Sequence, residues 1–143
     1  MIEKKEMTMK RKNAEILIRQ YFQSWLTQDL DLFLSTMSND VHVTECYGPV
    51  YVGIDEVRQW FINWHEGSGQ GKVTRWDIAS IFYDDTQQTA AVEWDFECVY
   101  EGNLAGFLGA SLFHFHAEKI SRIQEYQMEK EQYRPFEQKI QSN

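Results

Sequence analysis

The chain of 143 residues has little of what marks fibrous, disulfide-rich or membrane proteins. Its two Pro and eight Gly exclude collagen-like and low-complexity classes. Its only cysteines, Cys46 and Cys98, lack CxxC spacing, so we expect two buried free thiols. No apolar run approaches the roughly 20 residues that a membrane-spanning helix needs. The sequence therefore predicts a globular chain that is not held together by disulfides.

Positive charge is also scarce. The chain has 14 Lys and Arg against 22 Asp and Glu, which gives a net charge of −8. Such an acidic chain repels phosphate backbones and anionic lipid surfaces, so we expect neither nucleic acid nor a membrane as partner. The N-terminal residues MIEKKEMTMKRKN lack the apolar centre of a secretory signal. We therefore expect a cytoplasmic protein.

Aromatic side chains, in contrast, are abundant. Hydrophobic residues make up 43% of the chain and aromatic residues 15%, a composition that excludes intrinsic disorder. The length fits one domain. We expect a disordered or frayed lead-in over residues 1–12, a single domain over 13–137 and a frayed tail over 138–143. The aromatic segment 133–136 is able to pack back on the body.

Three segments show helical periodicity. The first, residues 13–27, repeats apolar residues at spacings of three and four. Asp29 is a good N-cap for a second helix over 30–37. Gly53 opens a third helix, which the glycines of segment 67–71 end.

The rest of the chain reads as β-structure. Apolar alternation and β-branched residues predict strands over 41–46, 50–52, 72–83, 89–100, 104–117 and 120–129. Helices followed by a run of long antiparallel strands argue for an α+β class. One curved sheet must bury one face against three helices, so we expect a cone-shaped α+β barrel with a pocket at its wide end.

Three stretches carry a family resemblance: AEILIRQYFQSWLTQDLDLFLSTMSNDVHV, GIDEVRQWF and SLFHFHAEKISRIQEY. Over residues 13–130 the chain resembles the nuclear transport factor 2-like superfamily, in particular its SnoaL-like and ketosteroid-isomerase-like branch. The resemblance implies three helices packed on a strongly curved, mainly antiparallel sheet. It leaves the reaction open, because this fold hosts isomerases, dehydratases, cyclases, epoxide hydrolases and non-enzymatic binders.

The resemblance also implies roles for single residues. Tyr21 falls at the position of the Tyr that steadies an oxyanion in ketosteroid isomerases, and Glu45 at or next to their base. Their second acid does not carry over, because Phe113 or a near neighbour takes its place, which argues against steroid isomerisation. From the residues alone, Glu45 is either a base with a raised pKa or a strand-end carboxylate paired with Arg75 or Arg122. Tyr21 is either a pocket residue or an ordinary core tyrosine.

Bulky apolar side chains should form the pocket wall. We expect it to contain Trp25, Trp64, Trp94, Phe96, Phe107, Phe113, Tyr126 and Met128. Such a wall suits a small, flat, hydrophobic molecule, unless the side chains fill the cone. His114 and His116 form an H-x-H pair without a matching third ligand, so a surface or interface pair is favoured over a metal site. We expect no metal and no cofactor.

The convex face of the sheet should be mixed. By strand alternation it carries Arg75, Asp77, Glu93, Asp95, Glu97, His114 and His116, with Ile81, Val99 and Leu112 among them. Large apolar residues on an open sheet face indicate a partner. The resemblance implies that this partner is a second copy, sheet against sheet. Should the histidines lie near the acidic residues, their protonated forms would be favoured.

Two functions remain open. The leading hypothesis is a protein that binds a small hydrophobic organic molecule and, if catalytic, isomerises, dehydrates or cyclises it by acid/base chemistry. Glu45 would then move the proton and Tyr21 would steady the oxyanion. The competing hypothesis is a non-catalytic binding or dimerisation module of the same fold. A hollow cone containing both side chains favours the first, and a filled cone favours the second.

Overall fold

The computed structural model describes residues 9–137, which form three helices and six strands in the order predicted from the sequence. The helices are α1 (Arg11–Thr27), α2 (Leu30–Ser35) and α3 (Ile54–Glu66). The strands are β1 (Met37–Thr44), β2 (Val50–Val52), β3 (Lys72–Asp84), β4 (Thr89–Tyr100), β5 (Asn103–His116) and β6 (Lys119–Met128).

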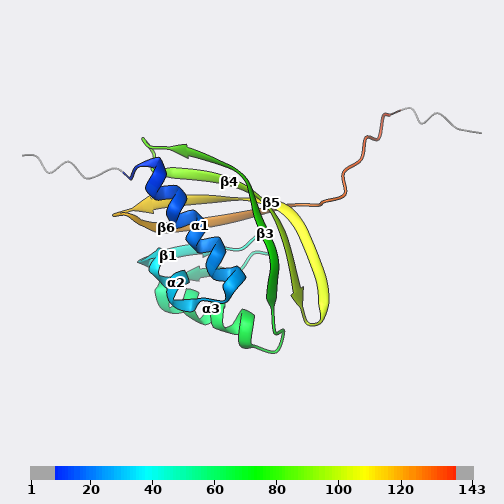
Figure 1. Ribbon diagram of the computed structural model, residues 1–143, viewed down its shortest axis with the longest axis horizontal. Coiled ribbons are helices and arrows are strands. Elements are labelled where there is room, and N and C mark those ends of the chain that lie inside the picture. Colours follow the sequence, from blue (N-terminus) through cyan, green and yellow to red (C-terminus); the bar gives the residue numbers. More distant parts are fainter. Residues whose placement is uncertain (1–8, 138–143) are drawn as a thin grey trace, which may run out of the picture.

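The strands form one sheet in the order β2-β1-β6-β5-β4-β3. All neighbours are antiparallel except β1 and β6, which run parallel. The long strands β3, β4 and β5 arch strongly, and the helices lie on the concave side of the sheet, with α1 across it (Figure 1). The expected α+β class, with three helices on a curved and mainly antiparallel sheet, is confirmed.

Local sequence explains the helices. Helix α1 buries the stripe that contains Ile18, Tyr21 and Trp25. The carboxylate of Asp29 accepts a hydrogen bond of 3.0 Å from the backbone N–H of Leu32, which is the predicted N-cap of α2. The second helix is shorter than predicted, because the chain enters β1 already at Met37 and the polar residues 38–40 lie within that strand.

The strand register shifts at four places, and two of these shifts turn side chains to the face opposite to the predicted one. The register of β3 shifts between Ile78 and Ser80, so Ile81 packs against the core instead of lying on the convex face as predicted. The register between β5 and β6 shifts as well, because Phe115 pairs with Ile120 while His114 pairs with Arg122. This shift leaves one extra residue in β6 and reverses the orientation of every later side chain in that strand.

The core between sheet and helices is dense and aromatic. Tyr21, Phe33 and Phe113 are completely buried in it. Gly109 of β5 lies under the Trp94 ring, and a Cβ at this position would collide with that ring and with the backbone carbonyl of Tyr126. The missing side chain therefore lets the indole lie against the strand, where its N–H donates to the Ser111 hydroxyl at 2.9 Å.

The two ends of the described chain behave differently. Met9 is buried and α1 begins at Arg11, so residues 9–12 of the predicted lead-in belong to the folded body. At the other end, Tyr133 and Phe136 are 82% and 96% exposed, and the segment after β6 runs away from the sheet instead of packing on it (Figure 1). The remaining parts of the predicted frayed ends, residues 1–8 and 138–143, lie outside the described residues.

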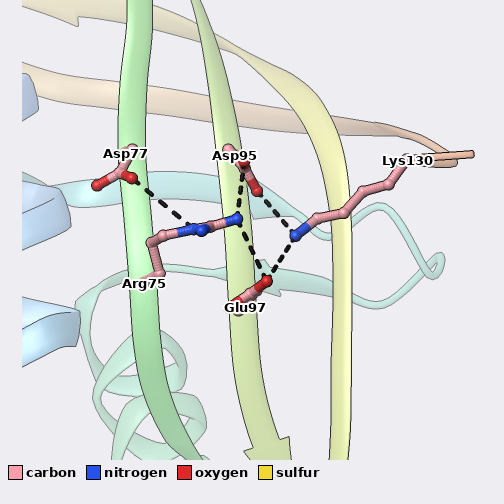
Figure 2. A network of polar contacts seen from close by, with 5 residues as sticks. All are labelled: Arg75, Asp77, Asp95, Glu97 and Lys130. Atoms are coloured by element: carbon pink, nitrogen blue, oxygen red, sulfur yellow. Dashed lines mark hydrogen bonds and ion pairs between the residues drawn. The ribbon is translucent and has the colours of Figure 1, made fainter.

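The convex face carries a network of charges. Arg75 lies 2.9 Å from Asp95, 3.2 Å from Glu97 and 3.7 Å from Asp77. Lys130, just beyond β6, lies 3.0 Å from Asp95 and 2.9 Å from Glu97 (Figure 2). Acidic and basic residues of the neighbouring strands β3 and β4 therefore pair across the sheet, and Lys130 extends the network.

None of the helices within residues 9–137 combines the length and the apolar composition that crossing a membrane requires.

Candidate functional site

A cavity of about 490 Å³ lies between the helices and the concave face of the sheet. Every layer of the fold contributes to it, from α1 and α3 to the loop after β1 and the strands β2 to β6. Its wall contains Trp25, Glu45, Cys46, Tyr47, Tyr51, Trp60, Asn63, Trp64, Val73, Trp76, Trp94, Phe96, Cys98, Tyr100, Asn103, Ala105, Phe107 and Glu125. The cone is therefore hollow despite its many bulky side chains.

Aromatic rings dominate this wall and support one another. The rings of Tyr51 and Trp60 are stacked, with centroids 4.8 Å apart and planes 14° from parallel. Those of Trp64 and Tyr100 are stacked at 5.8 Å. Such contacts stabilise the arrangement of the rings around the cavity.

Glu45 follows β1 directly and points into the cavity. The hydroxyl of Tyr51 donates to its carboxylate at 2.6 Å. Burial raises the pKa of Glu45, while Tyr51 and the nearby indole of Trp60 favour the ionised form and act against the rise. The alternative pairing with Arg75 or Arg122 does not occur in the described part of the chain; the partner is a tyrosine.

Glu125 is the second carboxyl group of the cavity, and sequence reasoning missed it. In the parallel pair of strands Thr44 pairs with Gln124, and the next residue in each segment is a glutamate. Both glutamates line the cavity. Burial, and next the negative charge of Glu45, raise the pKa of Glu125 to about 8, although the backbone N–H of Cys46 acts against this. At neutral pH Glu125 is therefore mostly protonated.

Tyr21 lies beneath the cavity rather than in its wall. It is completely buried among the rings of Phe22, Phe33, Trp76 and Phe113. Its hydroxyl has no hydrogen-bond partner among the described residues. Burial, and next the charge of Glu125, raise its pKa well above the ordinary value. Tyr21 thus combines features of both earlier interpretations, a core position and an unpaired hydroxyl.

Among the described residues, the buried indole N–H groups of Trp25, Trp60 and Trp76 form no hydrogen bond of normal geometry, although that of Trp60 lies close enough to Glu45 to favour its ionised form. All three residues line the cavity. An unpaired buried donor costs about 1–3 kcal/mol. These nitrogen atoms are themselves shielded from the cavity, so the three residues line it with their rings rather than with their N–H groups.

The structure brings five of the eight residues predicted to line the pocket into its wall, Trp25, Trp64, Trp94, Phe96 and Phe107. Phe113 instead fills the core, and Tyr126 and Met128 are more than half exposed on the convex face. The irregularity in β6 explains the last two, because it turns Glu125 inward and Tyr126 outward. The sequence contains one sign of this irregularity, because the apolar residues Ile120 and Ile123 are three positions apart. Strict alternation would place them on opposite faces, yet both are buried.

The remaining candidates are placed as follows. Cys98 is buried and Cys46 partly buried, and both are free thiols in the cavity wall. His114 lies opposite Thr89 and Arg122 rather than beside acidic residues, and burial, followed by the charge of Arg122, lowers its pKa. Its protonated form is thus disfavoured, contrary to the expectation for an acidic neighbourhood. Within residues 9–137 no cluster of three or more His, Cys, Asp or Glu is arranged to hold a metal ion.

Solved structures define the class of fold. A protein described as a candidate polyketide cyclase from Xanthomonas campestris superposes with a TM-score of 0.69 at 20% identity, covering 81% of this chain and 90% of that one. An LEH-like epoxide hydrolase of Mycobacterium tuberculosis gives 0.69 at 13% identity, with 82% and 84% covered. An NTF-2 like protein of unknown function from Burkholderia xenovorans gives 0.70 at 14% identity, with 93% and 99% covered. At such identities the likeness concerns the fold, which is the NTF2-like fold.

The family follows from the sequence itself. The sequence model of the SnoaL-like domain matches residues 18–123, which is most of the chain. The chain therefore belongs to the SnoaL-like domain family, within the NTF2-like superfamily that its sequence resembles. No curated protein matches it.

Proposed function

We propose that the cavity binds a small, flat, hydrophobic organic molecule and that Glu45 and Glu125 transfer protons on it without a cofactor. The observation that carries this proposal is the pair of carboxyl groups side by side in an aromatic cavity. Two titratable groups whose surroundings push their pKa values apart are the usual basis of acid and base roles. The reaction class is enolisation, isomerisation, dehydration or cyclisation.

The roles follow from the surroundings of each carboxyl group. The carboxylate of Glu45 accepts a hydrogen bond of 2.6 Å from the hydroxyl of Tyr51. This bond favours the ionised form of Glu45, which is the form that a base needs. Glu125, with a pKa of about 8, still carries its proton at neutral pH and suits an acid. The protonated carboxyl group of Glu125 would also donate a hydrogen bond to an oxygen atom of the substrate on which negative charge develops.

An exchange experiment tests this proposal without knowledge of the natural substrate. Flat, enolisable ketones such as 1-tetralone are incubated with the protein in D₂O, and loss of the α-proton signals is followed by NMR. We expect exchange faster than in buffer alone, because the base Glu45 and the acid Glu125 face the same cavity. Quenching of tryptophan fluorescence reports binding separately. Binding without faster exchange would contradict catalysis and favour the non-catalytic binding module.

We further propose that the chain forms a homodimer through the convex face of its sheet. Four large apolar residues are more than half exposed, namely Phe82, Leu104, Tyr126 and Met128. Strand alternation did not predict the outward orientation of three of them, Phe82, Tyr126 and Met128. Exposed apolar residues on an open sheet face favour association. The family resemblance described above implies the same partner, a second copy in a two-fold arrangement of sheet against sheet.

Light scattering at micromolar concentration tests the dimer. We expect the wild-type protein to have twice the mass of one chain, and Tyr126→Asp to be a monomer, because a charge would have to be buried in the interface. Tyr133→Asp is the matched control, since that tyrosine is exposed on the segment after β6. A monomeric wild type would contradict the proposal, and so would a dimer unaffected by Tyr126→Asp.

A further inference from the structure

Carboxyl groups on the convex face of the sheet form ion pairs, whereas those in the cavity do not. On the convex face, Asp77, Asp95 and Glu97 each have Arg75 or Lys130 within 4 Å (Figure 2). In the cavity, neither Glu45 nor Glu125 forms an ion pair with any described residue. Enclosed carboxylates are normally compensated by a positive partner. The cavity lacks that partner.

The ionisable groups that line the cavity are all acids. They are Glu45, Cys46, Tyr47, Tyr51, Cys98, Tyr100 and Glu125, and within the described chain no Lys, Arg or His side chain belongs to the lining. Burial, and then the charges of Glu125 and Glu45, raise the pKa of the Cys46 thiol to about 12. Glu45 at neutral pH, and Glu125 as well once it ionises above about pH 8, therefore create a negative potential that no basic residue of the lining neutralises.

The aromatic wall suits a positive charge as well. Ring faces attract cations, most strongly when water is excluded, and Trp is the most effective ring. The stacked pairs Tyr51/Trp60 and Trp64/Tyr100 stand in the same wall as the two carboxyl groups.

We propose that the ligand of this cavity is an organic cation, a small flat molecule whose protonated or quaternary nitrogen lies against Glu45 and Glu125 among the aromatic rings. The inference rests on the proposed binding of a small organic molecule in this cavity and adds its charge. A neutral hydrocarbon of equal shape would leave the carboxylates uncompensated.

The charge of the ligand fixes the sign of the pH dependence. A cation binds the ionised form of Glu125 more tightly than the protonated form, so its affinity rises as the pH passes through about 8. The groups that face Glu125 are Tyr21 from α1, Tyr51 from β2 and Glu45, Cys46 and Tyr47 from the chain after β1. Cys98 and Tyr100 of β4 line the same cavity, and His65 of α3 packs on Trp25 behind its wall.

A matched pair of probes tests the inference. Phenyltrimethylammonium and tert-butylbenzene have nearly the same shape and differ in one atom, a cationic nitrogen or a neutral carbon, and neither titrates. Binding is followed by quenching of tryptophan fluorescence at pH 6 and pH 9. We expect the cation to bind about tenfold more tightly than the hydrocarbon at pH 9 and to lose most of that advantage at pH 6.

Variants separate the contributions of the two carboxyl groups. In Glu125→Gln the advantage of the cation should no longer depend on pH. In Glu45→Gln it should persist at pH 9 and extend to lower pH, because Glu125 is still present and loses the neighbouring charge that raises its pKa. Glu97→Gln, on the convex face, should behave like the wild type. If tert-butylbenzene binds as tightly as the cation at pH 9, the inference is wrong while the hydrophobic pocket of the proposed function stands. If neither probe binds the wild type, both are wrong.

Discussion

Replacing Glu125 with glutamine is expected to raise the free energy of unfolding at pH 9 by about 2–4 kcal/mol. In the folded protein the pKa of Glu125 is about 8, against an ordinary value of 4.5. The folded chain therefore holds a proton that the unfolded chain releases between pH 4.5 and 8, and the stability of the wild type falls over this range. Glutamine has nearly the same shape and does not titrate, so it removes that loss.

Urea unfolding at pH 5, 7 and 9 measures the effect. The variant and the wild type should have similar stabilities at pH 5 and diverge as the pH rises, because the difference comes from the proton alone. Glu97→Gln is the control, since Arg75 and Lys130 hold the pKa of that carboxyl group below its ordinary value. That variant should gain nothing at pH 9. An equal slope of stability against pH in wild type and Glu125→Gln would show that Glu125 is ionised throughout.

Replacing Glu45 with glutamine is expected to lower the rate of α-proton exchange in bound ketones by about 10²–10⁴-fold, the usual contribution of a general base. The amide retains the shape of the side chain and can still accept the hydroxyl of Tyr51, so the fold and the cavity should persist. Because Glu45 would act while the proton is transferred in the transition state, its replacement should lower kcat more than it changes KM.

NMR exchange rates at saturating ketone, together with circular dichroism of the variant, provide the measurement. Glu93→Gln is the matched control, because this glutamate lies on the convex face and does not line the cavity. Its exchange rate should equal that of the wild type. An unchanged rate in Glu45→Gln would remove Glu45 from the mechanism and leave Glu125 as the remaining carboxyl group.

Most of the fold could be predicted from local sequence, because the periodicities are strong. The stripe of α1, the cap at Asp29 and the glycines that end α3 each have a local physical cause and are found where expected. The parallel pairing of β1 with β6 could not be predicted, because the local sequence of a strand does not indicate which other strand it pairs with. It also overestimated the effect of polar residues 38–40, which the sheet accommodates in β1.

The candidate site was harder to predict, because its residues depend on single irregularities. Counting by twos along β6 puts Tyr126 in the cavity and Glu125 outside, and one extra residue near Ser121 reverses this. The same error in β3 placed Ile81 on the convex face. Glu45 could be found because it directly follows a regular strand. Glu125 could not, because its orientation is set by pairing across the sheet.

The parallel pairing of β1 with β6 has a consequence for how the protein folds. These strands come from opposite ends of the domain, so closing the loop between them costs more entropy than forming any hairpin of the sheet. During synthesis, β1 and the three helices emerge long before the strand that completes their sheet. Glu45 and Glu125 thus meet only after nearly the whole domain has been made. The unfavourable contact between two carboxyl groups is therefore postponed until the native topology is in place, and a chain that stops before β6 has neither the contact nor the cavity wall that it completes.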